Sequence, residues 1–127
     1  MSKWNDFHAF YEHLLTEVYH EPDSMLTTQV TDRMIPGFLE LFTTNEKILD
    51  LGCGAGYAMK KMRELGMKNV EGLTLNDEDI KAVEQEGFKV HKLDFNFTGF
   101  KDKYDGIWMR HVLEHSPFPL YTIYQLN

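Results

Sequence analysis

ILDLGCGAGYAM occupies residues 48–59 of the chain. Apolar residues surround one acid, Asp50, and glycines follow at alternate positions before a helical pattern begins. Glycine permits a sharp turn and leaves backbone amides open to a ligand, because it carries no side chain. The stretch therefore predicts a buried strand, a ligand-binding turn at Gly52, Gly54 and Gly56, and a helix directly after the turn.

Strands and helices alternate beyond this stretch. The patterns predict strands at residues 47–51, 69–75, 88–95 and 104–110, and helices at residues 57–65, 77–86 and from 117 onward. The residues expected to point inward from the first of these helices are Ala58, Met59, Met62 and Leu65. Connections this short imply right-handed crossovers, and hence a parallel sheet with helices on both faces. The fold class is therefore α/β.

The first third of the chain is predicted to be helical. Apolar residues at helical spacing predict one helix over residues 3–19, followed by a loop over residues 20–26. The next residues that keep the helical period are Val30, Met34, Phe38 and Leu41. Pro36 is expected to kink or split this second helix.

Length, composition and charge limit the possible functions. The 127 residues contain no linker, so we expect one domain over residues 1–127, with a helical cap at 1–45 and an α/β core at 46–127. A net charge of -7 argues against a general nucleic-acid surface, because polyanion binding needs a concentrated positive field, and leaves open only the reading of one nucleotide in a pocket, so we expect no nucleic-acid partner. No stretch approaches ~18 apolar residues and no signal-peptide layout is present, so we expect a cytoplasmic protein without a membrane partner.

The glycine spacing separates two kinds of nucleotide ligand. A dinucleotide fingerprint reads G-x-G-x-x-G, and counting from Gly52 its last glycine would fall on Tyr57. The chain instead reads G-x-G-x-G, with Asp50 two residues before the first glycine. An acid there would repel a pyrophosphate but could hold an ammonium group. The spacing therefore disfavours a dinucleotide.

On these residues the chain resembles the class I S-adenosylmethionine-dependent methyltransferases. ILDLGCGAG is similar to their first motif, and the resemblance continues through VEGLTLNDEDIKAV, VHKLDF and YDGIWMRHVLEH. The resemblance implies a Rossmann-like parallel sheet in the strand order 3-2-1-4, flanked by helices and preceded by the helical cap. It also implies S-adenosylmethionine as the cofactor.

The resemblance assigns roles to individual residues. Asp50 would anchor the methionine end of the cofactor. The residues lining the cofactor's path would be Gly52, Cys53, Gly54 and Gly56. Asp94 would accept a hydrogen bond from the adenine amino group, with Phe95 beside the ring, although a solvated strand end and core packing are the alternatives. Backbone around Arg110 and His111 would complete the pocket wall.

The end of the second strand departs from the family's usual pattern. Most members place an acid there to bind both ribose hydroxyls, whereas this chain has Thr74 followed by Leu75. A threonine offers one hydroxyl and cannot bridge two ribose oxygens. A subset resembling the cyclopropane-forming and tocopherol-type methyltransferases shares the threonine, so the assignment stands with weaker expected binding. Asp77 and Asp79 lie nearby and are expected to be solvated.

Two other chemistries, a zinc site and a cysteine nucleophile, are less consistent with the sequence. HVLEH, from His111 to His115, matches a zinc-binding pattern, but it follows a strand where the resemblance places a pocket loop, so we expect no metal. The other histidines, including His91, show no ligand spacing and are expected at the surface. Cys53 lacks an indicated activating base, so we expect a small turn residue rather than a nucleophile, and no catalytic residue can be named.

The resemblance ends soon after the fourth strand, so the chain looks truncated relative to the family. In the order 3-2-1-4 the fourth strand lies at an edge with unpaired backbone groups, and we expect it to pair either with a second copy in a homodimer or with another element of the chain. Two hypotheses for function remain open. One is S-adenosylmethionine-dependent methyl transfer to an unidentified small-molecule acceptor. The other is a truncated or degenerate cofactor-binding domain without catalytic activity.

Overall fold

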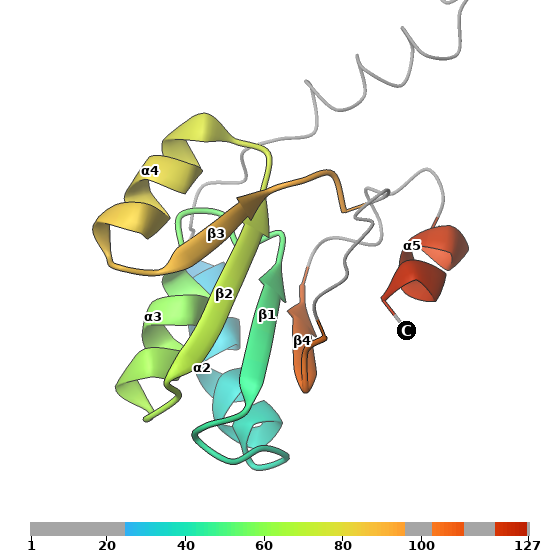
Figure 1. The fold of residues 1–127 in the computed structure, drawn as a ribbon. Helices are drawn as coiled ribbons and strands as arrows, with labels where there is room; N and C mark the ends of the chain where they lie inside the picture. Colours follow the sequence, from blue (N-terminus) through green and yellow to red (C-terminus); the bar gives the residue numbers. More distant parts are fainter. Residues whose placement is uncertain (1–24, 96–102, 111–118, 127) are drawn as a thin grey trace, which may run out of the picture.

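The structure is a computed structural model that describes residues 25–95, 103–110 and 119–126. Helices and strands alternate from α2 to β3 as predicted, and β4 and α5 follow (Figure 1). The elements are α2 (Met25–Leu39), β1 (Lys47–Leu51), α3 (Tyr57–Glu64), β2 (Asn69–Thr74), α4 (Asp77–Gln85), β3 (Lys89–Lys92), β4 (Gly106–Met109) and α5 (Pro119–Gln125). The predicted α/β class is therefore confirmed.

All four strands form one parallel sheet in the order β3-β2-β1-β4, as expected. On β1, Asp50 lies opposite Gly72 of β2 and opposite Trp108 of β4. The start of β1 is bonded to the segment before β4, because Lys47 N donates to Asp105 Oδ2 at 2.8 Å and Asp105 N donates to Lys47 O at 2.8 Å. Because all pairings are parallel, the C-terminal ends of all four strands lie at one edge of the sheet.

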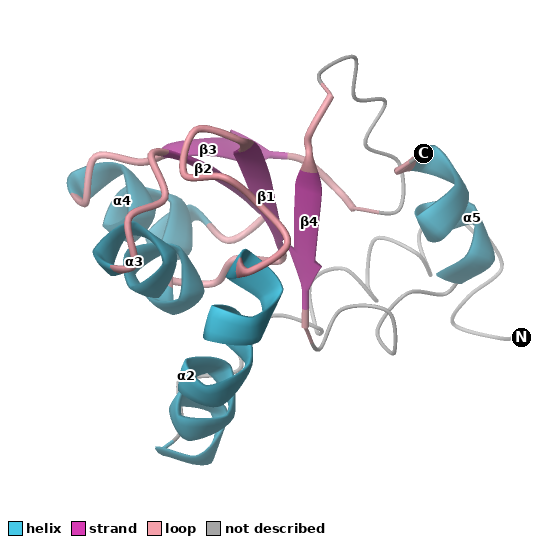
Figure 2. Cartoon of the chain, turned by 90° about the horizontal axis from the view of Figure 1, so that it is seen from below, coloured by secondary structure: helices cyan, strands magenta, loops and turns pink. Residues whose placement is uncertain are grey.

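The two faces of the sheet carry separate cores. Helices α2, α3 and α4 lie on one face, and α5 lies beyond β4 (Figure 2). The buried residues of the helix-covered face are Ile35, Ile48, Cys53, Met59, Met62, Met67, Val70, Val83 and Trp108. The opposite face buries Leu49, Leu51 and Leu73 almost completely. The predicted helices on both faces are therefore not found within the described residues, but both faces of β1 bury apolar side chains, so β1 reads as a nearly continuous apolar run.

The end of α3 differs from the predicted inward face. Gly66 N donates to Arg63 O and Met67 N donates to Met62 O, both at 3.0 Å, which is a Schellman ending. This turn directs Met67 into the core, where it is only 4% exposed, whereas Leu65 is 46% exposed. The prediction that Leu65 points inward is therefore wrong.

Helix α2 bears on two further predictions. The helix continues through Pro36 without a break, so the split is wrong and the kink, the other expected effect of Pro36, stays a prediction. Thr31 and Ile35, four residues apart, are its buried residues, whereas Met34 is 53% exposed. Of the residues that keep the predicted period, Phe38 packs against the core, Met34 does not, and Leu41 lies beyond the end of the helix.

Other predictions lie wholly or partly outside the described residues. The helix at 3–19, the segment 111–115 and Pro117 lie outside them, and α2 begins inside the loop predicted at 20–26. Within the described ranges no strand pairs with the outer side of β4, so the homodimer stays a prediction. No helix in those ranges is long and apolar enough to cross a membrane.

Candidate functional site

The glycine loop, residues 52–56, joins the C-terminal end of β1 to the first turn of α3. Its three glycines all have positive φ: Gly52 (75°), Gly54 (53°) and Gly56 (90°). Gly52 N and Cys53 N both donate to Leu73 O, at 2.9 and 3.0 Å. Side chains disfavour positive φ, so the backbone path of this loop explains the alternating glycines.

The surroundings of Gly54 and Gly56 differ. A Cβ atom at Gly54 would have no heavy atom of the described residues within 4 Å, whereas one at Gly56 would lie 3.1 Å from Val83 Cγ2. Gly56 therefore allows α4 to pack closely against the loop. Gly54 instead faces open space that a ligand can enter.

Asp50 is a buried acid beside this loop. Its exposed fraction is 3%, and no residue in the described ranges forms a hydrogen bond or ion pair with its carboxyl group. Burial raises the pKa of Asp50 to about 7. A buried carboxyl without a partner costs folding free energy, so its presence here indicates a cationic or hydrogen-bonding ligand.

Cys53, the one cysteine of the chain, is buried in the same loop. Burial, followed by the charges of Asp50 and Asp79, raises the pKa of the Cys53 thiol. A thiol held in its protonated form is a poor nucleophile. This environment agrees with the prediction that Cys53 is a turn residue.

Asp79 overturns a prediction from the sequence. It lies in the first turn of α4, where Asn76 Oδ1 accepts from Asp79 N at 3.0 Å, and it is only 6% exposed. Asp79 and Val83 are four residues apart and share the helix face that contacts the glycine loop at Gly56. The expectation of a solvated Asp79 is therefore wrong, and a second acid faces the loop.

Asp77, by contrast, is largely exposed as expected. Its side chain is 72% exposed and pairs with Lys92 at 2.7 Å. That pair lies on the surface, where the energetic contribution is small. Only the second of the two nearby acids therefore belongs to the candidate site.

A side-chain hydrogen bond stabilises the turn that follows β2. Thr74 is buried, and its Oγ1 accepts from Asn76 N at 3.3 Å. The hydroxyl thus helps to set the entry into α4, and Leu75 beside it is half-buried. This arrangement gives Thr74 a structural contact independent of any ligand.

Asp94 and Phe95 follow β3 at the same edge of the sheet. Both are half-buried. Phe95 packs against the core cluster of Leu49, Leu51 and Leu73. Core packing, the alternative considered for Phe95, is therefore present, and a ligand contact for its ring remains a prediction.

Arg110 directly follows β4, at the edge that carries the glycine loop. Its Nη1 donates to Thr27 O at 2.6 Å and to Thr31 Oγ1, so the side chain contacts α2. His111, predicted beside it, lies outside the described residues. In the described part of the chain, no three His, Cys, Asp or Glu residues are placed to hold a metal.

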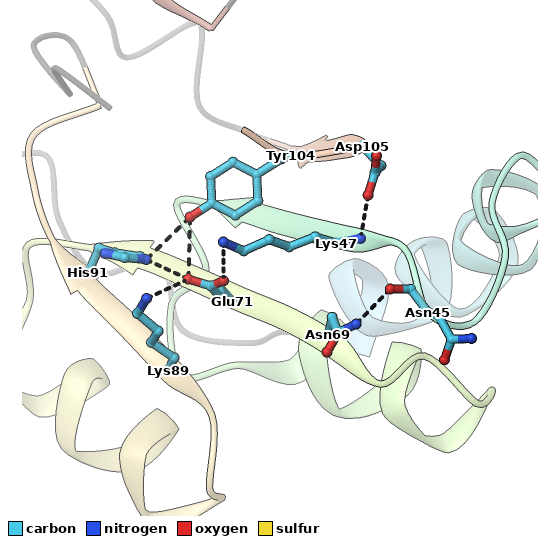
Figure 3. Close-up of polar contacts among 8 residues, drawn as sticks. All are labelled: Asn45, Lys47, Asn69, Glu71, Lys89, His91, Tyr104 and Asp105. Carbon is cyan, nitrogen blue, oxygen red and sulfur yellow. Dashed lines mark hydrogen bonds and ion pairs between the residues drawn. The ribbon is translucent and has the colours of Figure 1, made fainter. Parts of the chain in front are cut away.

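A second polar cluster lies on the sheet face opposite α3 (Figure 3). We call it the Glu71 cluster, and its members are Lys47, Glu71, Lys89, His91 and Tyr104. Glu71 lies 2.9 Å from Lys47 Nζ, 3.4 Å from Lys89 Nζ and 2.8 Å from His91 Nε2. Burial alone would raise the pKa of Glu71, but hydrogen bonds from His91 and Lys47 and the lysine charges lower it to about 2.

The Glu71 cluster also corrects the prediction for His91. The side chain of His91 is only 17% exposed, and Tyr104 Oη lies 3.3 Å from its Nε2. The cluster joins three strands with the segment before β4, because its residues come from all four places. His91 is therefore a structural residue of the sheet rather than a surface histidine.

The parallel sheet and the glycine loop at its C-terminal edge define the class I, Rossmann-like architecture of S-adenosylmethionine-dependent methyltransferases. The family model described as "Methyltransferase domain" matches residues 26–127. The chain belongs to this methyltransferase family.

Curated relatives extend the likeness. The tRNA U34 carboxymethyltransferases of Shewanella pealeana and Shewanella amazonensis are 31% and 32% identical to the chain over 104 residues. The match covers 76% of this chain and 31% of each relative. The chain thus spans about a third of the length of the curated relatives it matches.

Solved structures share the fold at low sequence identity. Magnesium protoporphyrin IX methyltransferase from Synechocystis PCC 6803, with bound SAM, has a TM-score of 0.67 and 16% identity, covering 94% of this chain and 66% of that one. The structure described as a sarcosine dimethylglycine methyltransferase from Galdieria sulphuraria has a TM-score of 0.67 and 23% identity. The match covers 92% of this chain and 52% of that one. These likenesses establish the architecture.

Proposed function

We propose that this protein binds S-adenosylmethionine at the glycine loop and transfers its methyl group to a small-molecule acceptor. The observation that carries the proposal is the buried carboxyl of Asp50, which has no partner in the described ranges and lies beside glycines with positive φ. Family membership supports the same cofactor.

Asp50 has the chemistry to hold the cofactor's ammonium group. Ionising a carboxyl whose pKa is about 7 costs little free energy near pH 7. A cation about 4 Å away would interact with it by roughly 4 kcal/mol at an effective dielectric constant of about 20. The attraction therefore exceeds the cost of ionisation, and a bound ammonium would convert Asp50 from a destabilising group into a binding group.

The glycine loop has the space that such a ligand needs. Open space beside Gly54 leaves the loop backbone accessible, and the positive φ angles direct that backbone in a way few other residues permit. The role of Gly54 would be to admit the cofactor. Gly56 would instead keep α4, and with it Asp79, close to the loop.

Asp79 is the residue we propose for the ribose hydroxyls. Thr74, at the usual position of the ribose-binding acid, already accepts a hydrogen bond from Asn76 N. Asp79 is a carboxyl on the helix face that contacts the loop, and a carboxylate can accept from two hydroxyls. Asp94 and Phe95 remain the proposed adenine contacts.

S-adenosylmethionine supplies a methyl group activated by a sulfonium, so transfer depends mainly on how the acceptor is positioned. The residues named here bind and orient the cofactor, and none of them is assigned as a general base. The alternative is a cofactor-binding domain without catalysis. Both functions require the same cofactor site, and only methyl transfer also requires a bound acceptor.

Calorimetric titration with S-adenosylmethionine, S-adenosylhomocysteine and NAD tests the cofactor. We expect the two adenosyl ligands to bind and NAD not to bind. Gly54→Val should abolish binding by filling the open space, whereas Gly37→Ala, a helix glycine with nothing within 4 Å of its added Cβ, should leave it unchanged. Absence of adenosyl binding to the unmodified protein would overturn the proposal.

A transfer assay tests the acceptor. Methyl-labelled S-adenosylmethionine would be incubated with the protein and either a pool of small metabolites or total tRNA, the substrate class named for the Shewanella relatives. The net charge of -7 favours the small molecules. Label in tRNA would replace the proposed acceptor, and binding without transfer to either pool would favour the non-catalytic alternative.

A further inference from the structure

Polar contacts join the first half of α2 to the elements around the glycine loop, and besides the two described next Asp32 pairs with Lys61 of α3 at 3.9 Å. Arg110 Nη1 donates to Thr27 O at 2.6 Å and to Thr31 Oγ1. Tyr57 Oη donates to the carboxyl of Asp32, at 2.9 and 3.1 Å from its two oxygens. Both contacts connect residues far apart in the sequence, so neither is a local feature of a helix or turn.

Each contact involves a residue next to an element of the candidate cofactor site. Tyr57 is the first residue of α3 and directly follows Gly56 of the glycine loop. Arg110 directly follows β4, whose last residue, Met109, lies opposite Leu51 at the end of β1. The first half of α2 is thereby bonded to the residue after the loop and to the residue after the neighbouring strand.

The second half of α2 is held independently. Ile35 is completely buried in the core. The ring centroids of Phe38 and Trp108 lie 5.2 Å apart in an edge-on arrangement. These apolar contacts lie away from the two polar ones along the helix. Loss of the Arg110 contact should therefore loosen the first half of α2 around Thr27 and Thr31, where Tyr57 still holds Asp32, without unfolding the domain.

We propose that Arg110 and the Tyr57–Asp32 pair are positioning residues that couple the docking of α2 to cofactor binding. Docked, α2 holds the guanidinium of Arg110 and the ring of Tyr57 in fixed places around the glycine loop, so the loop is ordered before the ligand arrives. By reciprocity, a ligand that binds the ordered loop must stabilise the docked helix by the same factor. The inference rests on the proposed adenosyl ligand.

Hydrogen exchange with and without S-adenosylhomocysteine tests the coupling. In Arg110→Met we expect faster exchange over residues 27–33, unchanged exchange over the rest of α2, and affinity for the ligand about tenfold weaker. The ligand should slow exchange over 27–33 in the unmodified protein more than in the variant. Arg110→Lys should restore part of the affinity, because its ammonium can still donate to Thr27 O.

Matched variants exclude a general effect of losing an arginine or a tyrosine hydroxyl. Arg63→Met removes an exposed arginine that pairs with Glu86 and should change neither the affinity nor the exchange of α2. Tyr57→Phe removes the hydrogen bond to Asp32 and keeps the ring, and it should weaken binding in the same direction as Arg110→Met, which keeps the test valid if that variant folds poorly.

Three results would overturn the inference. The first is unchanged exchange and affinity in Arg110→Met. The second is faster exchange over 27–33 with unchanged affinity, which would make the contacts purely structural. The third is no ligand binding by the unmodified protein, which removes the coupling together with the proposed function, whereas the first two leave that function intact.

Discussion

Asp50 of β1 and Gly72 of β2 are register partners, so a buried carboxyl lies beside a strand residue that has no side chain. A Cβ atom at Gly72 would lie 2.8 Å from both Cys53 Sγ and Met59 Sδ. The two sulfur-bearing side chains occupy the space above Gly72. The packing of the loop next to Asp50 therefore depends on the missing side chain.

Gly72→Ala should destabilise the domain by about 1–3 kcal/mol, because the added methyl overpacks the contact between β2 and the glycine loop. Urea unfolding followed by circular dichroism measures this loss. Gly37→Ala is the control, since its Cβ meets nothing within 4 Å and alanine favours the helix, so it should raise stability by up to ~1 kcal/mol. Equal stability of Gly72→Ala and the unmodified protein would contradict the packing account.

Asp50→Asn should make the ligand-free protein more stable and remove adenosyl binding. The pKa of Asp50 is raised by burial to about 7, whereas the unfolded chain ionises near 3.8, so unmodified stability falls as pH rises between these values. At pH 8 the amide variant should be more stable by on the order of 2–4 kcal/mol. A variant that loses stability at pH 8 would show that Asp50 already has a favourable partner.

The affinity for S-adenosylhomocysteine should rise with pH up to about 7 and then level off. Binding of an ammonium requires the ionised form of Asp50, which becomes the majority form only above its pKa of about 7. Dissociation constants should be about tenfold weaker at pH 6 than at pH 8. Calorimetry at both values checks this, and equal affinities would exclude Asp50 as the ammonium ligand.

Glu71→Gln should weaken the domain near neutral pH and flatten its loss of stability in acid. The pKa of Glu71 is lowered to about 2 from 4.5, so its contribution is fully present above pH 4.5 and is lost as pH falls towards 2. We expect the variant to lose about 2–3 kcal/mol at pH 7. Glu40→Gln, an exposed carboxyl, is the control and should change stability by less than ~0.5 kcal/mol.

The outer edge of β4 should support self-association. Strand β4 pairs only with β1 within the described ranges, and α5 beside it exposes Leu120 (83%) and Tyr124 (74%). Edge strands and exposed apolar side chains both favour contact with another chain. Light scattering should give about twice the chain mass of 14.9 kDa at high concentration, and a single 14.9 kDa species throughout would contradict the homodimer.

The parts of the fold that follow from local sequence were predicted well. The strand before the glycine loop, the three glycines and the Asn76 cap are each encoded by neighbouring residues. Asn76 Oδ1 accepts from Glu78 N and Asp79 N, as a cap at that position should. Short connections then left few topologies to consider.

The errors concern residues whose burial is decided by distant partners. Asp79 was expected in solvent because acids favour exposed first turns, but contact of its helix face with Gly56 buries it. His91 is enclosed by Glu71 and Tyr104, twenty and thirteen residues away. The spacing of Asp79 and Val83 was the available signal, since a residue one turn from a buried valine shares its face.

Sequence separation also orders the assembly of the domain. The contact between His91 and Glu71 spans 20 residues, that between Lys47 and Asp105 spans 58, and that between Arg110 and Thr27 spans 83. Closing an 83-residue loop costs about 1 kcal/mol more chain entropy than closing a 20-residue one. Folding should therefore begin with the three strands β1 to β3 and the helices between them, and the Arg110 contact should form last. The acquisition of ligand affinity during refolding would then lag behind the formation of secondary structure.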